Sequence, residues 1–304
     1  MPQAQQVTAV GSAALDTLIT PQGRVDDALG GSVSFIGAIG GLFAPINIVS
    51  VVGDDFPLKD YDFLLDRNVN LDGLEIASGS TFRWTGKYHE DMNIRDTLNT
   101  SLGVFENFVP KIPLAALEAK YLLLANINPE LQLDVLDQMK APKLVAFDTM
   151  NMWINTTRDQ VQEVIRRVNL VIFNDEEVTL LTGKKSLLAG AIVIANMGPD
   201  YVVVKKGEHG SFLIGRDGLP FICPAFPIAK PVDPTGAGDT FAGAMMGYLA
   251  ATDDLSAFNL RRSIVYGTIA ASFTVEDYGL NRLKSLTLND IEERFRQFRS
   301  MLEF

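Results

Sequence analysis

The stretch Asp233-Pro-Thr-Gly-Ala-Gly-Asp239-Thr-Phe241 combines a tight turn, two carboxylates and the start of an apolar segment. Pro234 restricts its own φ to about −65° and keeps Asp233 out of the helical region, so a helix can begin only after this dipeptide. The short side chains of residues 236–238 let their amides approach a ligand closely, and the helix-compatible segment 239–250 follows at once. Free amides and a helix dipole that converge at one point favour an anion, so the stretch predicts a phosphate or oxyanion site.

Asp239 is the unusual member of this stretch. A carboxylate beside a resting phosphate would repel it, yet it could accept the proton of a hydroxyl that attacks the phosphate. The two features together indicate phosphoryl transfer. The alternative is that residues 236–238 form only a tight turn and that Asp239 is only a helix N-cap, since aspartate is among the preferred capping residues. A P-loop is excluded because no Lys-Ser/Thr pair follows the glycines.

Composition and charge restrict the class of protein. The chain has 304 residues, of which 47% are hydrophobic, and a net charge of −11. Such a chain can form one large core, and without a basic run we expect no nucleic-acid partner. The single cysteine, Cys223, cannot form an internal disulfide, which favours a reducing compartment such as the cytoplasm. No run of about 18 apolar residues is present, so no membrane partner is expected.

The rest of the chain alternates short apolar runs with helical patterns. We expect strands at residues 7–12, 46–52, 121–126, 144–147, 170–173 and 201–205. This order is typical of right-handed β-α-β crossovers and predicts an α/β fold: a doubly wound, mostly parallel sheet covered by helices on both faces, in a single domain over residues 1–304. Ligands of such folds bind at the carboxyl ends of the strands. Four polar residues follow two of these strands and are interpreted as turn or cap residues, one or two of which reach the pocket: Asn126, Asn128, Asp148 and Asn151.

Residues 233–239, followed by Gly243-Ala-Met-Met246, resemble the second signature of the ribokinase-like, phosphofructokinase B family of small-molecule kinases. A diglycine at 30–31, Asn174-x-x-Glu177 and a glycine turn at 207–210 occur in family order, so the resemblance covers nearly the whole chain. It implies the ribokinase-like fold with a small β lid formed from about residues 13–29 and 80–103.

The resemblance also implies roles for individual residues. Asp239 would be the catalytic base, with the amides of Gly236, Ala237 and Gly238 as the anion hole. ATP and Mg²⁺ are the implied cofactors, and Glu177 would hold hydrated Mg²⁺ through water. The nucleotide would contact Asn174, Glu177, Lys205, Gly207, Gly210, Gly267 and Ala271. The acceptor would contact Asp16, Gly30, Gly31, Phe35 and Asn126. A potassium site present in many relatives would involve Asp233, Thr235 and Gly279.

Several of these residues have a structural alternative. Asn174 and Glu177 could simply cap a helix, because an Asn N-cap and acidic residues in the first turn suit the helix dipole. The diglycine at 30–31 could serve close packing of a helix on the sheet, and Lys205 could be exposed to solvent. Polar and aromatic residues of the lid could face the substrate, a partner subunit in a homodimer, or solvent: Arg83, Trp84, Lys87, Tyr88 and Arg95.

Phe35 affects the expected acceptor. It stands where members of the family often carry an asparagine, so it exchanges a polar contact for an apolar or stacking surface. We expect an ATP-dependent kinase that phosphorylates a hydroxyl of a small polyhydroxylated molecule, a sugar or a cyclitol such as myo-inositol. The alternatives are a nucleoside kinase, in which Phe35 and Trp84 stack on the base, and a non-catalytic ligand sensor on the same fold.

Overall fold

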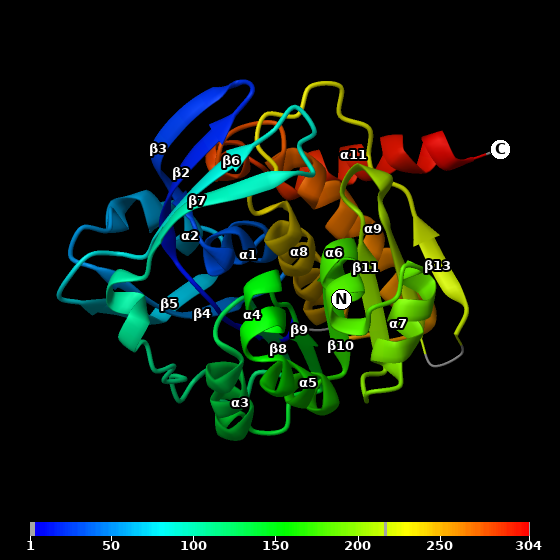
Figure 1. Cartoon of the computed structure of the whole chain (residues 1–304), viewed down its shortest axis with the longest axis horizontal. Coiled ribbons are helices and arrows are strands. Elements are labelled where there is room, and N and C mark those ends of the chain that lie inside the picture. The colour runs from blue at the N-terminus through cyan, green and yellow to red at the C-terminus, as the bar shows by residue number, and fades with distance from the viewer. Residues whose placement is uncertain (1–3, 216–217, 304) are drawn as a thin grey trace.

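The computed structural model describes residues 4–215 and 218–303, whose strands form two sheets (Figure 1). The larger sheet has the strand order β13-β12-β11-β10-β9-β8-β1-β4-β5, parallel from β5 to β11 and antiparallel at β12 and β13. Most of its strands are apolar runs buried on both faces, which is typical of parallel sheets. They are β1 (Val7–Val10), β4 (Ile46–Gly53), β5 (Val69–Ala77), β8 (Tyr121–Leu124), β9 (Leu144–Phe147), β10 (Leu170–Asn174), β11 (Tyr201–Lys205), β12 (Ser211–Gly215) and β13 (Pro220–Cys223). The expected mostly parallel sheet is confirmed.

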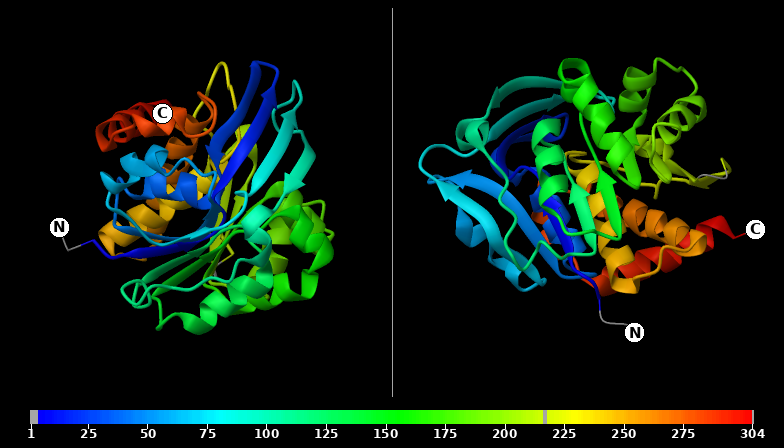
Figure 2. Two further views of the ribbon diagram at one scale, coloured as in Figure 1. Left: turned by 90° about the vertical axis from the view of Figure 1, so that its left-hand side faces the viewer. Right: turned by 90° about the horizontal axis from the view of Figure 1, so that it is seen from below.

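Helices cover both faces of this sheet (Figure 2). Successive strand residues serve the two cores alternately: Leu123 packs in one, and Leu122 and Leu124 in the other. The first core includes residues of α1 (Ser32–Gly40), α8 (Ala237–Thr252), α9 (Ala257–Thr274) and α11 (Leu288–Leu302). The second includes residues of α3 (Pro129–Gln138), α5 (Arg158–Arg167), α6 (Asp175–Thr182) and α7 (Leu187–Ala195). The shorter elements are η1 (Leu58–Tyr61), α2 (Asp62–Leu65), η2 (Gly103–Asn107), α4 (Asn151–Thr156), η3 (Gly207–His209) and α10 (Asn281–Lys284).

A second sheet stands apart from the first and has the order β3-β2-β6-β7 (Figures 1 and 2). Its strands come from the two segments expected to form a lid: β2 (Ala14–Thr20), β3 (Gly23–Gly30), β6 (Arg83–Tyr88) and β7 (Arg95–Ser101). One face of β2 is buried, whereas every residue of β7 is exposed, so this sheet packs on the molecule mainly through its first strands. Its movement as a lid stays a prediction.

Helices α6 and α7 form a bent apolar pair. In the part of the chain that the structure describes, no single helix is long and apolar enough to cross a membrane. Helices α6 and α7 have the length and composition of a membrane span only when taken together, and a 65° bend separates them. Both helices bury one side in the second core, through Val178, Leu181 and Ile194.

Candidate active site

The Gly-Ala-Gly turn leads into helix α8. Gly236 precedes the helix with φ 75° and ψ 1°, a left-handed conformation that glycine adopts without strain. Gly236 has no side chain to cap the first turn of α8. The Ala237 amide donates to the Pro234 carbonyl oxygen over 3.1 Å, so the amides of Gly236 and Gly238 are the candidates for an anion. Asp239 is the third residue of this helix, so the alternative that it serves as the N-cap is wrong.

Phe35 of α1 lies directly against this turn. Its ring is 1% exposed, and a Cβ on Gly236 would overlap three of the ring carbons. The structure therefore contradicts the expected stacking of Phe35 on a substrate, since the ring has no open face. Phe35 instead supports the backbone of the anion turn, and Gly236 leaves the space that the ring fills.

Asp239 lies near a group of charged side chains at the ends of neighbouring strands. Asp148 follows β9, and Lys205 is the last residue of β11, with its Nζ 3.3 Å from each carboxylate oxygen of Asp148. The same ammonium would lie 3.1 Å from a Cβ on Gly238, which places it against the first turn of α8. The solvent-exposed alternative for Lys205 is therefore wrong, and its charge is available to an anion in the turn.

The protonation of Asp239 follows from this environment. Loss of hydration raises the pKa of Asp239 to about 7, repulsion from Asp148 adds to the rise, and the cations Lys205 and Arg95 oppose it. A carboxyl group with a pKa near neutrality is well suited to accept a proton at pH 7. Asp148, for which the sequence alone indicates a turn or cap residue, is thus part of the candidate site.

Asn174 and Glu177 form the cap of helix α6. The Glu177 amide donates to Asn174 Oδ1 over 2.8 Å, and the Asn174 amide donates to Glu177 Oε2 over 2.7 Å. This capping box confirms the structural alternative, yet it does not account for the burial of Glu177, which is only 5% exposed. Burial raises the pKa of Glu177 to about 8, and the nearby Asp148 adds to the rise.

The carboxylates fit a magnesium ion that arrives with a nucleotide. A cation between Asp148 and Glu177 would relieve their repulsion, and Mg²⁺ commonly uses one or two carboxylates together with phosphates and water. Within residues 4–215 and 218–303, no three Asp, Glu, His or Cys side chains form a complete metal site by themselves. Glu177 therefore suits an outer, water-mediated contact better than a closed protein cage.

Asp16 explains why the chain carries a diglycine. The side chain of Asp16 is buried on β2, and a Cβ on Gly30 would overlap its carboxylate. Gly31 has φ 81°, and a Cβ there would lie 2.7 Å from Cα of Ala13. The two glycines thus make room for Asp16 and for the chain between β1 and β2. Loss of hydration raises the pKa of Asp16 to about 8, with repulsion from Asp233 and Asp239 adding to it.

Asn126 follows β8 and is held by its neighbours. Its Oδ1 accepts a hydrogen bond from Trp153 Nε1 over 3.0 Å, and its Nδ2 lies 3.2 Å from the sulfur of Met150. Both ends of the amide are therefore engaged with α4 and the residue before it. Its contact with an acceptor stays a prediction.

Glycines on the expected nucleotide side serve different purposes. Gly207 begins η3 and Gly210 follows it, with φ 53° and 77°, as expected for a tight turn. Gly267 is buried, and a Cβ there would lie 2.9 Å from the backbone oxygen of Phe241, so this glycine lets α9 pack closely on α8. The expected contact of Gly267 with adenine is therefore not supported. Ala271, one turn further along α9, is only partly buried and remains a candidate for that contact.

Asp233 joins the anion turn to the loop before α10. Its Oδ1 accepts from the Thr235 amide over 2.9 Å, and its Oδ2 accepts from the Gly279 amide over 3.1 Å. The three residues expected at a potassium site therefore lie together. The hydrogen bonds already hold the two segments to each other, and a role for K⁺ stays a prediction.

The inner face of the second sheet carries an aromatic residue beside Asp16. Asp16 on β2 is in register with Trp84 on β6, so their side chains project from the same face of the sheet. The Trp84 ring lies over Gly86, where a Cβ would overlap it, and Nε1 donates to Thr97 Oγ1 over 3.2 Å. The indole is therefore fixed along the strand with one face against the backbone.

Two hydrogen bonds connect the second sheet to the site on the first. The hydroxyl of Tyr88, at the end of β6, lies 3.0 Å from Thr235 Oγ1 in the anion turn. Asn93, between β6 and β7, donates to Glu208 Oε1 in η3 over 3.3 Å. The β6–β7 hairpin thus contacts both the anion turn and the turn on the expected nucleotide side.

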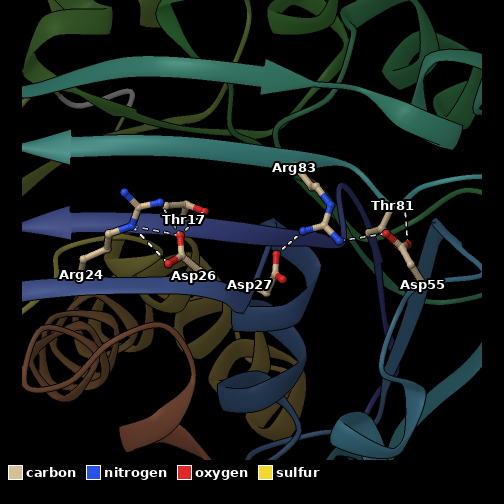
Figure 3. Close-up of polar contacts among 7 residues, drawn as sticks. All are labelled: Thr17, Arg24, Asp26, Asp27, Asp55, Thr81 and Arg83. Carbon is tan, nitrogen blue, oxygen red and sulfur yellow. Dashed lines mark hydrogen bonds and ion pairs between the residues drawn. The ribbon is translucent and has the colours of Figure 1, made fainter.

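Arg83 holds the connection between the two sheets (Figure 3). Its guanidinium pairs with Asp27 of β3 and, at 2.9 Å, with Asp55 after β4. Asp55 also accepts hydrogen bonds from the amide and hydroxyl of Thr81. Although partial burial opposes ionisation, these donors lower the pKa of Asp55 to about 2. Arg83 is therefore an anchor of the second sheet, and its charge is already used by two carboxylates.

Known proteins share this arrangement. A family model described as pfkB family carbohydrate kinase matches residues 38–286, which include the anion turn, Lys205 and the cap of α6. The chain belongs to this kinase family. The expected resemblance is thereby confirmed, and the coarse activity is that of a ribokinase-family kinase.

Individual relatives and structures add detail. A cytidine kinase of Thermococcus kodakarensis is 32% identical over 250 residues, covering 80% of this chain and 87% of the relative. The structure of a Burkholderia thailandensis nucleoside kinase in complex with inosine has a TM-score of 0.79 at 18% identity, covering 97% of this chain and 99% of the other. An E. coli ribokinase II in complex with ATP and Mg²⁺ has a TM-score of 0.76 at 19% identity, covering 96% and 99%. These two structures establish the shared ribokinase-like fold.

Proposed function

We propose that this kinase transfers a phosphoryl group from ATP to a hydroxyl of a nucleoside. The pairing of Asp16 with Trp84 on the inner face of the second sheet carries the choice of acceptor. A carboxylate accepts hydrogen bonds from two neighbouring hydroxyls, as on a ribose, and an indole face offers a stacking surface for the attached base. The likeness to the cytidine kinase of T. kodakarensis supports the same acceptor class.

The chemistry follows from the groups around the anion turn. Asp239 accepts the proton of the attacking hydroxyl, the hydroxyl oxygen bonds to the γ-phosphorus, and ADP leaves with its former bridging oxygen. The amides of Gly236 and Gly238 and the ammonium of Lys205 stabilise the charge of the transferring group, whereas the Ala237 amide donates to the Pro234 carbonyl oxygen. Mg²⁺, bound with ATP near Glu177, would neutralise phosphate charge. Potassium dependence, a homodimer through the second sheet and a cytoplasmic location stay predictions.

The role of Asp239 has a direct test. Asp239→Asn keeps the size of the side chain and removes the base, so we expect kcat to fall by about 10²–10⁴-fold while ATP still binds. Near-normal turnover would remove Asp239 from the mechanism. Consumption of ATP by the wild type across a panel of acceptors also separates an enzyme from a non-catalytic sensor.

The acceptor class is tested with Trp84→Ala. Stacking on a base contributes about 1–3 kcal/mol, so the KM for cytidine or inosine should rise by about 5- to 150-fold, whereas the KM for ribose should change little. A sugar or cyclitol is the second candidate, favoured by the description of the family as carbohydrate kinases. A higher kcat/KM for ribose or myo-inositol than for every nucleoside would refute the nucleoside proposal.

A further inference from the structure

Ser34, in the first turn of α1, connects a buried tyrosine to the diglycine. Its Oγ lies within hydrogen-bonding distance of the Gly30 carbonyl oxygen and of the Tyr61 hydroxyl at the end of η1. A carbonyl oxygen can only accept, so the single hydroxyl proton of Ser34 is donated to Gly30. The Tyr61 hydroxyl must then donate to Ser34 Oγ. The two hydroxyls therefore form a chain of fixed direction that ends on the backbone between β3 and α1.

Both members of this chain are buried. Ser34 is 0% exposed and Tyr61 is 1% exposed, and the Tyr61 ring packs edge-on against Phe56 with the ring centres 4.9 Å apart. Burial raises the pKa of Tyr61, and the nearby Asp16 carboxylate adds to the rise, so Tyr61 keeps the proton that it donates. Loss of the Ser34 hydroxyl would remove a donor from Gly30 and also leave Tyr61 without its partner.

The other side of the same peptide group faces Asp16. The Gly30 carbonyl and the Gly31 amide belong to one peptide plane, and they point in opposite directions because this peptide is trans. Burial raises the pKa of Asp16, and a hydrogen bond from the Gly31 amide to its carboxylate opposes the rise. A donor on the carbonyl side therefore also sets the direction of the amide that binds Asp16.

Glycine on both sides makes this peptide group easy to rotate. The β2–β3 ladder ends at Gly30, which is paired with Ala14, and Gly31 already has φ 81°. Ser34 thus adds a side-chain restraint at the point where the ladder stops. A half-turn of the peptide plane would direct the Gly30 oxygen, in place of the Gly31 N–H, toward the carboxylate of Asp16.

We propose that Ser34 and Tyr61 are positioning residues for the acceptor: they hold the Gly30–Gly31 peptide so that its N–H faces the Asp16 carboxylate. The proposal rests on the acceptor-binding role of Asp16 in the function proposed above. A carboxylate held by an amide presents its remaining lone pairs in one direction, which the hydroxyls of the acceptor must match. Loss of the restraint weakens the acceptor site and leaves the groups that hold ATP in place.

The test uses Ser34→Ala, Tyr61→Phe and the double variant, with Tyr121→Phe as the matched control. Tyr121 is also a buried tyrosine, and its hydroxyl donates to Asp253, but it begins β8 at the end of the sheet opposite the site. We expect Ser34→Ala to lower kcat/KM for the acceptor by about tenfold and Tyr61→Phe to lower it by a smaller factor, both with an unchanged KM for ATP. Tyr121→Phe should change neither constant.

The double variant separates positioning from stability. Ser34→Ala leaves the buried Tyr61 hydroxyl without a partner and should lower the free energy of unfolding, and the added Tyr61→Phe should restore part of it. The kcat/KM for the acceptor should stay low in the double variant, because the Gly30 carbonyl still lacks its donor. A kcat/KM that recovers together with stability, or one that Ser34→Ala leaves unchanged, would overturn the proposal.

A second measurement needs no acceptor. The sequence has two Gly-Gly pairs, 30–31 and 40–41, so glycine labelled at both its carbonyl carbon and its nitrogen identifies the Gly31 and Gly41 amides in an NMR spectrum. The Gly31 amide proton should move upfield in Ser34→Ala as its bond to Asp16 weakens. The Gly41 amide, which donates to Gly37, should keep its position. An unchanged Gly31 signal would overturn the proposal even if the kinetics change.

The acceptor in the kinetic assays is cytidine, or ribose if the wild type prefers it. A preference for ribose refutes the nucleoside proposal, and the same comparison of Ser34→Ala with Tyr121→Phe then decides the role of Ser34 with ribose. A wild type that phosphorylates no nucleoside, sugar or cyclitol would overturn the kinase function and, with it, this role.

Discussion

Gly236→Ala tests whether Phe35 holds the anion turn in place. Gly236 has φ 75°, and a residue with a Cβ in the left-handed region costs about 1–2 kcal/mol. The new Cβ would also overlap the buried ring of Phe35, and overpacking of this kind typically costs about 1–3 kcal/mol. We therefore expect the free energy of unfolding to fall by about 2–5 kcal/mol. Because the turn carries the amides that we propose to bind the transferring group, kcat should fall as well.

Gly183→Ala is the matched control. Gly183 follows α6 with φ 67°, and nothing lies within 4 Å of the position of its missing Cβ. This variant therefore carries only the backbone cost of about 1–2 kcal/mol and should leave kcat unchanged. Phe35→Leu in the Gly236→Ala background should recover part of the difference, because the smaller side chain relieves the overlap.

The measurements are urea unfolding, followed by circular dichroism, and steady-state kinetics on the same preparations. The reasoning is refuted if Gly236→Ala and Gly183→Ala lose equal stability and Phe35→Leu recovers nothing. In that case the turn would be held by contacts other than the Phe35 ring.

Three further predictions concern Asp239, Asp16 and Arg83. Burial raises the pKa of Asp239 to about 7, so kcat/KM should fall about tenfold per pH unit below about pH 7; a flat profile down to about pH 5 would contradict a base role. Gly30→Ala places a Cβ on the Asp16 carboxylate and should lower kcat/KM for the acceptor by about 10²-fold without weakening ATP binding, as measured by calorimetry. Arg83→Met should lower the free energy of unfolding by about 1 kcal/mol or less, because its partners are partly exposed. Asp55 has a pKa of about 2 in the folded protein and about 4 in the unfolded protein, so ionised Asp55 stabilises the fold fully above about pH 4 and loses this effect as the pH falls toward 2. The difference in the free energy of unfolding between wild type and Arg83→Met should therefore shrink on acidification. A difference that grows would refute the role of Arg83 as an anchor.

The local chemistry of the chain can be predicted from its sequence. Pro234 and Gly236 restrict or permit backbone angles whatever surrounds them, so the anion turn and the start of α8 are readable from residues 233–241. The cap of α6 involves only residues 174–177 and is equally local. Apolar runs of four or five residues, alternating with helical patterns, predict the parallel sheet because only strands covered on both faces are apolar throughout.

Contacts between distant segments are different, because no spacing along the chain specifies them. Phe35 follows a diglycine that resembles a substrate loop, yet the packing of α1 against α8 turns its ring under Gly236. Gly267 resembles a nucleotide contact, and the close approach of α9 to α8 uses it instead. In both cases the sequence indicates a small or apolar residue, and the neighbouring helix decides what that residue touches.

The sequence by itself therefore determined the turn before α8 and the family of kinases, and it predicted Asp239 as the proton acceptor. Only the tertiary structure placed Asp148, Lys205 and Arg95 around Asp239, since Asp148 follows β9 and the other two residues lie on β11 and β7, strands of different sheets. The physical reason is that charge interactions at a buried site depend on the distances between the groups and on their loss of hydration. The order of residues along the chain specifies neither. The same reason makes Asp239, an ordinary acidic residue in the sequence, a carboxyl group with a pKa near 7 in the folded protein.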